Sequence, residues 1–294
     1  MAKKKAHHFV PRYYLKGFAM PKRGGKIWVY PKNGDRPFLT GIGNVGVGNH
    51  YYSKLKPDGS KDSETIENYL AGEIEEPANQ VIRKIRNLKP ITHEEKRILS
   101  IYMVGMMTRV PRHRERVKED VPRLIRQARE QINASVERWQ HRNPTDLKRT
   151  QHLHEQMIDS LSGIEKDVIE DLSFPIFDEN HIDILLSMNW ALKLCDDSKF
   201  SFLTSDNPFC YTEAVGLLHE GSIFAFPISN KIAILGTWQP QKYKYLDLLY
   251  LPSNKGEVHT INRIVCREAT RFVYYRSQAN WISEMLTSLQ METE

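Results

Sequence analysis

The periodicity of the sequence changes twice along the chain, and this order restricts the fold more than any other feature. Residues 26–30 alternate and are rich in strand formers, and strand-like runs return from residue 190 onwards. Between them, from about residue 63 to residue 172, apolar side chains recur at helical spacing. Strands at both ends with helices between them indicate an α+β protein. Since a lone short hairpin cannot bury its faces, we expect both strand regions to share a mixed or antiparallel sheet.

This order predicts a single domain, 1–294, in which 56–188 is a helical subdomain inserted between the sheet segments 1–55 and 189–294. A composition of 40% hydrophobic and 27% charged residues is that of a soluble globular chain. No apolar run approaches the roughly 20 residues of a membrane helix, and the basic N-terminus lacks a secretory h-region. Three distant cysteines without a CxxC pair argue against a zinc ribbon or disulfide framework. We therefore expect a cytoplasmic protein that does not enter membranes.

Local signals place the elements more closely. Thr92 and Glu95 have the spacing of a capping box, Pro77 is expected to kink a helix, and Pro111 to end one helix or open the next. The glycine-rich stretch 41–48 contains a GxGxxG-like piece, but no helix follows it, so we reject a dinucleotide site. Short strands are predicted at 50–53, 190–195, 200–204, 222–226, 232–235 and 272–275, and helices at 114–141, 145–172, 255–269 and 282–289.

The positive charge is concentrated in the middle of the chain. The segment 81–150 holds 18 Lys and Arg against 8 Asp and Glu, a net +10, whereas the whole chain carries only +6. One interpretation is a polyanion-binding surface, and the other is a set of solvated helix faces whose arginine stems cover apolar neighbours. The first predicts nucleic-acid contacts by five arginines of this segment: Arg112, Arg114, Arg116, Arg123 and Arg126.

Three phrases together resemble a known protein family. They are HHFVPRYYLKGF at 7–18, TRVPRHR at 108–114 and FLTSDNP at 202–208. Their order is similar to that of the domain-of-unknown-function 4238 family of mostly bacterial proteins, and the resemblance covers nearly the whole chain. The family has no assigned activity, so the resemblance implies an architecture and candidate positions but no reaction.

Candidate chemistry begins with the two N-terminal histidines. His7 and His8 are adjacent in an extended segment, so only one of them can face a given site. That one could be a metal ligand or a general base, or simply a buried histidine bonded to the backbone. Glu67 and Glu75 both follow an isoleucine of the apolar stripe, about 80° apart on an α-helix, and one metal could not easily bind both. Glu67 is the better candidate because Pro77 does not interrupt its part of the helix.

Arg109 and Asp206 belong to the two later phrases. The guanidinium of Arg109 could hold a phosphate, or could pair structurally with a carboxylate such as Glu67 or Asp206. Asp206 ends an apolar strand, either as a carboxylate presented to a site or as an Asx turn.

The leading hypothesis is a metal-dependent nuclease or phosphodiesterase with a site of His7 or His8, Glu67, Arg109 and Asp206. Its metal would be Mg²⁺ or Mn²⁺, held by Glu67, Asp206 and His8, and its substrate DNA or RNA. Such chemistry would suit bacterial defence. The alternatives are a non-catalytic nucleic-acid- or partner-binding module and an enzyme for a small anionic metabolite. No spacing predicts an oligomeric state.

Overall fold

The computed structural model describes residues 6–20, 24–49, 51–55, 61–62, 64–142, 147–170, 177–196, 200–212, 215–238 and 248–292. The chain divides into two compact units, one made of Met1–Pro111 with Pro175–Glu294 and the other of Arg112–Phe174. Of the segment 56–188, expected as a helical insertion, the part that separates is therefore 112–174. None of the helices that the structure describes is long and apolar enough to cross a membrane.

The first unit is an α+β fold whose strands come from both ends of the chain, as predicted. Two sheets form its framework, one of five strands and one of four. In spatial order the first contains β12 (Leu249–Pro252), β7 (Asn189–Leu194), β11 (Ile232–Thr237), β10 (Ile223–Ser229) and β9 (Cys210–Tyr211). The second contains β3 (Phe38–Gly41), β2 (Lys26–Pro31), β13 (Phe272–Tyr275) and β8 (Thr204–Ser205). The N-terminal β2 pairs with the C-terminal β13, which confirms the shared sheet.

Helices and two small strand pairs complete this unit. The helices are α1 (Arg12–Leu15), the 3₁₀ turn η1 (Ile42–Asn44), α2 (Thr65–Tyr69), the π-helical η2 (Leu70–Glu75), α3 (Glu76–Arg86), α4 (His93–Thr108), α7 (Glu179–Ser187), α8 (Lys255–Glu268) and α9 (Asn280–Met291). The small pairs are β1 (Ala6–His8) with β4 (Val47–Asn49) and β5 (Lys54–Leu55) with β6 (Lys61–Asp62). The capping box of Thr92 with Glu95 is present as predicted and fixes the start of α4.

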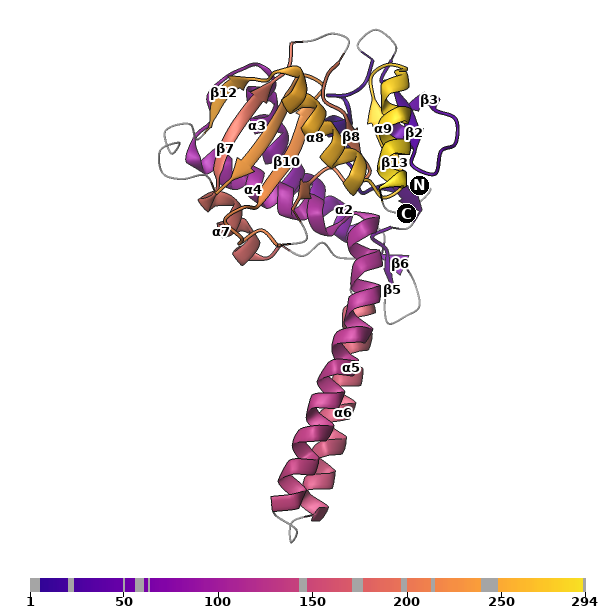
Figure 1. Cartoon of the computed structure of the whole chain (residues 1–294), viewed down its shortest axis with the longest axis vertical. Coiled ribbons are helices and arrows are strands. Elements are labelled where there is room, and N and C mark those ends of the chain that lie inside the picture. Colours follow the sequence, from indigo (N-terminus) through magenta and orange to yellow (C-terminus); the bar gives the residue numbers. More distant parts are fainter. Residues whose placement is uncertain are drawn as a thin grey trace. The chain divides into compact units, whose positions relative to one another are not determined.

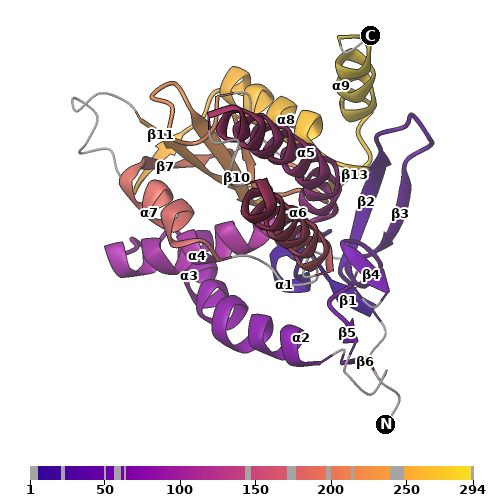
Figure 2. The same cartoon turned by 90° about the horizontal axis from the view of Figure 1, so that it is seen from below.

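The five-stranded sheet is covered on both faces, which explains its apolar strands. Phe224 and Phe226 of β10 pack into the core that contains residues of α3 and α4, whereas Ala225 between them packs with α8. Figures 1 and 2 show α8 on one side of this sheet and α3 with α4 on the other. A strand buried on both sides reads as a continuous apolar run, as β10 does.

Two of the predicted strands are wrong or partly wrong. The run 200–204 is a strand only from Thr204, because its backbone bonds to side chains and, at Phe202, to the carbonyl of Asn230 in a turn, and not to a neighbouring strand. The Leu203 amide donates to Asn262 Oδ1, and Asn262 Nδ2 donates to the carbonyl of Ser201 (3.1 and 3.0 Å). Of the strand predicted at 50–53, residues 51 and 52 form a turn, and residue 50 lies outside the described residues.

The opening phrase, residues 7–18, has a structural basis in the half-buried Arg86. Arg86 of α3 donates to the carbonyls of Tyr14 and Ile228, and so joins α1 to β10. A Cβ atom on Gly17 would lie 2.6 Å from the carbonyl oxygen of Ile228, so only glycine fits there. Burial lowers the pKa of Arg86, but its carbonyl partners satisfy the guanidinium.

The second unit contains two long helices, α5 (Pro111–Arg142) and α6 (Leu147–Glu170). Figure 1 shows them side by side along their length. His154 Nε2 lies 2.6 Å from Asn133 Oδ1, and Arg129 Nη2 donates to Ser162 Oγ at 2.8 Å, so the helices run antiparallel. Pro111 opens α5, one of the two roles that the sequence allowed it, and Pro122 lies inside the helix.

Candidate functional site

His7 is held in one orientation inside the first unit. The extended β1 pairs with β4, His7 opposite Gly48, and this directs the His7 ring inward, where it is fully buried. Nδ1 accepts from the backbone amide of Tyr52 at 2.9 Å, and the two rings stack at 5.7 Å. Since Nδ1 accepts, the neutral ring carries its proton on Nε2. The imidazole is therefore a donor at Nε2, and no hydrogen bond satisfies this buried atom.

The proton on His7 Nε2 faces a carboxylate. Glu67 Oε2 lies 3.9 Å from Nε2, longer than a hydrogen bond but within ion-pair range. The Glu67 side chain keeps 19% of its surface exposed, whereas that of His7 is fully buried. The pair thus joins a fully buried donor to a glutamate whose side chain is partly exposed. Catalytic contacts are often long in unliganded structures and shorten when substrate binds.

The π-helical segment η2 changes the relation between the two glutamates. An α-helix would place Glu67 and Glu75 about 80° apart. A π-turn takes up one extra residue, so positions eight apart are spaced as if seven apart, or about two α-helical turns. Glu67 and Glu75 therefore lie on nearly the same face. Pro77, where a kink was expected, sits directly after this segment in the first turn of α3, where proline is tolerated.

Glu75 is the partner of Arg109. Nη1 of Arg109 lies 2.7 Å from Glu75 Oε1, and the guanidinium, 1% exposed, also lies over the ring of Tyr102 at 5.9 Å. Burial by itself lowers the pKa of Arg109, but Glu75, Tyr52 and Tyr102 outweigh it and raise that pKa above its usual value. Burial raises the pKa of Tyr102, which stays a neutral phenol. The arginine is thus a permanent charge fixed beneath η2.

The structure brings together some of the predicted residues. His7 meets Glu67, and Arg109 meets Glu75 on the same face of the helix. Tyr52 is linked to both pairs, because its ring stacks on His7 and its phenol helps to raise the pKa of Arg109. We call these residues, His7, Tyr52, Glu67, Glu75 and Arg109, the His7–Arg109 cluster. His8 points away from it, with Nε2 3.3 Å from the carbonyl of Gly43.

Asp206 has a different set of partners. Its two carboxylate oxygens accept from the backbone amides of Thr270, Arg271 and Phe272 at 2.8, 2.8 and 3.2 Å, and its own amide donates to Phe272. The residue is 1% exposed. Asp206 therefore holds β8 against the beginning of β13, and these hydrogen bonds to the backbone give it a structural role. Burial raises the pKa of Asp206 to about 6, although the three amides act in the opposite direction.

The five predicted nucleic-acid contacts belong to the second unit. Arg112, Arg114 and Arg116 are half-buried near the start of α5, and Arg123 and Arg126 are exposed further along it. Arg123 forms an ion pair with Asp120 at 2.7 Å. The exposed pair of arginines is therefore the better placed to meet a polyanion.

The cation predicted at Glu67, Asp206 and His8 has no ready-made site. Among the described residues, no three His, Cys, Asp or Glu side chains gather in an arrangement that could hold a metal ion. Of the two acidic residues in this set, Glu67 has the partly exposed side chain, whereas Asp206 is buried.

Two members of the cluster were missed or set aside by sequence reasoning. No sequence motif indicates Tyr52, because it contributes a backbone amide and a stacked ring to the cluster. Glu75 was separated from Glu67 on the assumption of regular α-helix. The repeat of isoleucine followed by glutamate at 66–67 and 74–75 was the available signal, but only the π-segment shows why it matters.

No curated protein and no solved structure matches the chain. One family model does match, over residues 6–279, and so includes the three phrases that carry His7, Arg109 and Asp206. The chain therefore belongs to the family described as "Protein of unknown function (DUF4238)".

Proposed function

We propose that the protein is a hydrolase of phosphate esters, with nucleic acid as its substrate class and Glu67 as its general base. The observation that carries the proposal is the contact between buried His7 Nε2 and the partly exposed Glu67 Oε2. A histidine whose tautomer is fixed by a backbone amide can hold a carboxylate in one orientation. Such an arrangement is typical of sites that need a positioned base.

The chemistry follows from the exposure of the two groups. Glu67, which reaches solvent, takes a proton from water as the water oxygen attacks phosphorus. The bond from phosphorus to the leaving oxygen then breaks, and that oxygen is protonated by solvent. His7 donates towards Glu67 and orients it, so it is a positioning residue. Arg109, which pairs with Glu75, also acts by position, because its guanidinium is buried and does not reach solvent.

Charge on the surface supports the choice of substrate. The helix α5 holds nine Lys and Arg against five Asp and Glu, and Arg123 and Arg126 are exposed on it. Such a helix attracts phosphates without regard to sequence. Glu67 also has the carboxylate oxygens that Mg²⁺ or Mn²⁺ binds together with a substrate phosphate. A role in bacterial defence would suit this chemistry.

The second candidate is a non-catalytic module that binds nucleic acid or a protein partner. The full burial of His7 favours it, because a buried polar network can simply hold β1 and α2 to α4. Asp206 has a structural role under either candidate function, because both of its carboxylate oxygens accept hydrogen bonds from backbone amides.

An activity screen separates the two candidates. The full chain is incubated with end-labelled single- and double-stranded DNA, with RNA and with bis(p-nitrophenyl) phosphate, each in Mg²⁺, in Mn²⁺ and in a chelator. We expect cleavage of at least one nucleic acid. A folded protein that cleaves none of these substrates under any condition, yet retains nucleic acid on a filter, would establish the binding module instead.

A further inference from the structure

The helical hairpin of the second unit buries very little of its own apolar surface. Among the side chains that the structure describes between 112 and 165, Ile125 and Thr150 are the buried ones. Large apolar side chains are instead exposed: Leu124, Trp139, Leu153, Met157 and Ile164, at 42% to 56% of their surface. Scattered single residues of this kind need no explanation, but a contiguous patch marks an interaction site.

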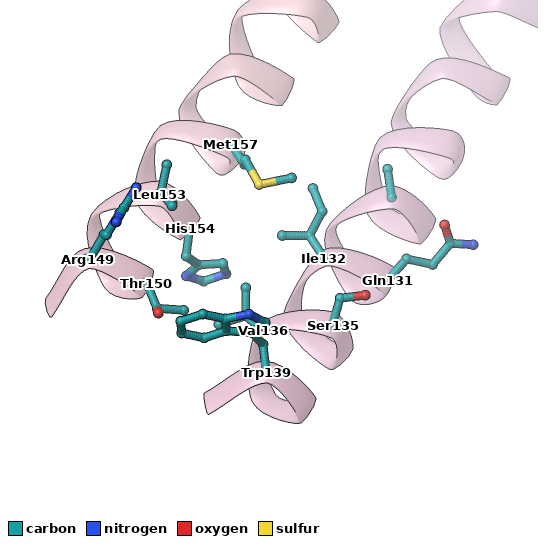
Figure 3. A pocket seen from close by; sticks show the side chains of 11 residues that line it. Gln131, Ile132, Ser135, Val136, Trp139, Arg149, Thr150, Leu153, His154 and Met157 are labelled. Carbon is teal, nitrogen blue, oxygen red and sulfur yellow. The ribbon is translucent and has the colours of Figure 1, made fainter. Parts of the chain in front are cut away.

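These side chains are contiguous. Figure 3 shows Ile132, Val136 and Trp139 of α5 on one side of a groove and Leu153 and Met157 of α6 on the other. The groove has a volume of about 730 Å³. On α6, residues 153, 157 and 164 follow one another at four and seven positions, so Ile164 extends the same face. On α5, residue 124 precedes groove-lining Ala128 by four, so Leu124 extends it too.

The two helices carry opposite charge. Nine Lys and Arg against five Asp and Glu make α5 basic, whereas α6 has three against five and is acidic. A second hairpin placed on the groove with the twofold axis along the helices sets α5 of each copy beside α6 of the other. Each basic helix then has an acidic neighbour on both sides, and the two basic helices lie on the diagonal.

The area of this face is sufficient. The 24-residue α6 is about 36 Å long, and two adjacent helices are about 20 Å wide, so the face covers about 700 Å² in projection. Side chains increase the accessible area above the projected one, and a stable protein interface buries about 800 Å² on each partner.

We propose that the groove between α5 and α6 binds the same groove of a second copy of this chain, so that two hairpins form a four-helix bundle and the protein is a dimer. A hairpin alone leaves the apolar side chains of the groove in water, whereas a four-helix bundle encloses them. A polyanion is the poorer occupant, because the residues that line the groove are mainly apolar.

The test compares the mass of the full chain with that of groove variants by sedimentation equilibrium over a wide range of protein concentration. Leu153→Glu with Met157→Glu introduces two charges into the groove. The matched control, Gln151→Glu with Leu218→Glu, adds the same charge on the opposite side of α6 and at a 75% exposed position of the first unit. Leu153→Ala with Met157→Ala removes apolar surface while it keeps strong helix formers. Circular dichroism verifies the helix content of each variant.

We expect wild type and control to sediment at twice the mass of one chain, the glutamate variant to be a monomer, and the alanine variant to dissociate at higher concentration than wild type. A monomeric wild type throughout the concentration range would overturn the proposal. So would a dimer whose dissociation is the same in wild type and in both groove variants.

Discussion

The ring proton on His7 Nε2 faces the carboxylate of Glu67 across 3.9 Å, and the Tyr52 amide fixes this direction from the other side of the ring. A backbone amide from a third segment, that of Tyr52, thereby orients His7 towards Glu67, which lies sixty positions later in the sequence. The proposed reaction depends on this relationship, and its parts can be altered separately.

The anchoring of His7 predicts different stabilities for two substitutions. In His7→Asn the side-chain oxygen can replace Nδ1 as the acceptor for the Tyr52 amide, whereas His7→Ala leaves this buried amide without a partner. An unsatisfied buried donor costs about 1–3 kcal/mol. We expect the free energy of unfolding, measured in urea, to be lower for the alanine variant than for the asparagine variant by about this amount. Equal stabilities would show that the Tyr52 contact does not anchor the ring.

The pair of Arg109 with Glu75 predicts a large loss of stability when one partner is neutralised. In Glu75→Gln the buried guanidinium loses its counter-charge, which costs about 3–5 kcal/mol in buried pairs. The control is Glu179→Gln, which breaks the exposed pair with Arg97 and should cost about 0–1 kcal/mol. The free energy of unfolding is measured in urea for both variants. A Glu75 variant no less stable than the Glu179 variant would contradict this account of the cluster.

The amide contacts of Asp206 predict a loss of stability in Asp206→Asn. Both carboxylate oxygens accept from backbone amides, so the variant must place an NH₂ group against at least one N–H donor. We expect a cost of about 1–3 kcal/mol in unfolding free energy. A metal-ligand role predicts the reverse: an unchanged melting temperature and lost turnover.

The same carboxyl predicts a pH dependence of defined sign. Burial raises the pKa of Asp206 from its ordinary 3.8 to about 6, so the folded state retains its proton over this interval while the unfolded state loses it. Its contribution to stability is therefore present at low pH and is lost as the pH rises from about 4 to about 6, by on the order of 3 kcal/mol. Subtraction of the Asp206→Asn profile from that of wild type should show this fall. A difference that rises with pH would mean that the three amides outweigh burial.

The exposed arginines predict salt-sensitive binding to nucleic acid. If Arg123 and Arg126 each neutralise one phosphate, their combined substitution by glutamate lowers the affinity and reduces the slope of log affinity against log salt by about 2. Lys231→Glu, an exposed cation of the first unit, is the control and should leave the slope unchanged. The measurement is fluorescence anisotropy with labelled single- and double-stranded DNA. Binding by wild type that does not depend on salt would count against the basic helix as the contact surface.

Much of the fold could be predicted because its signals are local. The capping box of Thr92, the alternation in β2 and the apolar run of β10 depend on neighbouring residues, and these elements are where the sequence predicted them. The strand predicted at 200–204 was largely wrong because Asn262, about sixty residues away, takes the backbone bonds that a neighbouring strand would supply. No local pattern contains that information.

The candidate site was predictable in part for the same reason. Adjacent histidines in an extended segment must face opposite ways, and His7 and His8 do. Which of them meets Glu67 depends on the pairing of β1 with β4, a long-range contact. The partnership of Arg109 with Glu75 depends on a π-turn that regular helix geometry does not anticipate. Asp206 was assigned to the site because it belongs to the phrase FLTSDNP. Its hydrogen-bond partners are instead backbone amides at the beginning of β13, which the sequence does not indicate.

The most direct test of the central claim is cleavage of end-labelled RNA and DNA by Glu67→Gln beside Glu73→Gln. Each substitution removes one carboxylate charge, Glu67 from α2 and Glu73 from the adjoining η2. Glu73, however, is exposed and lies outside the His7–Arg109 cluster. We predict that Glu67→Gln lowers the cleavage rate by about 10²-fold to 10⁴-fold, the contribution of a general base, with little change in melting temperature. Glu73→Gln should retain the wild-type rate. Equal rates for wild type and Glu67→Gln would contradict the assignment of Glu67 as the base.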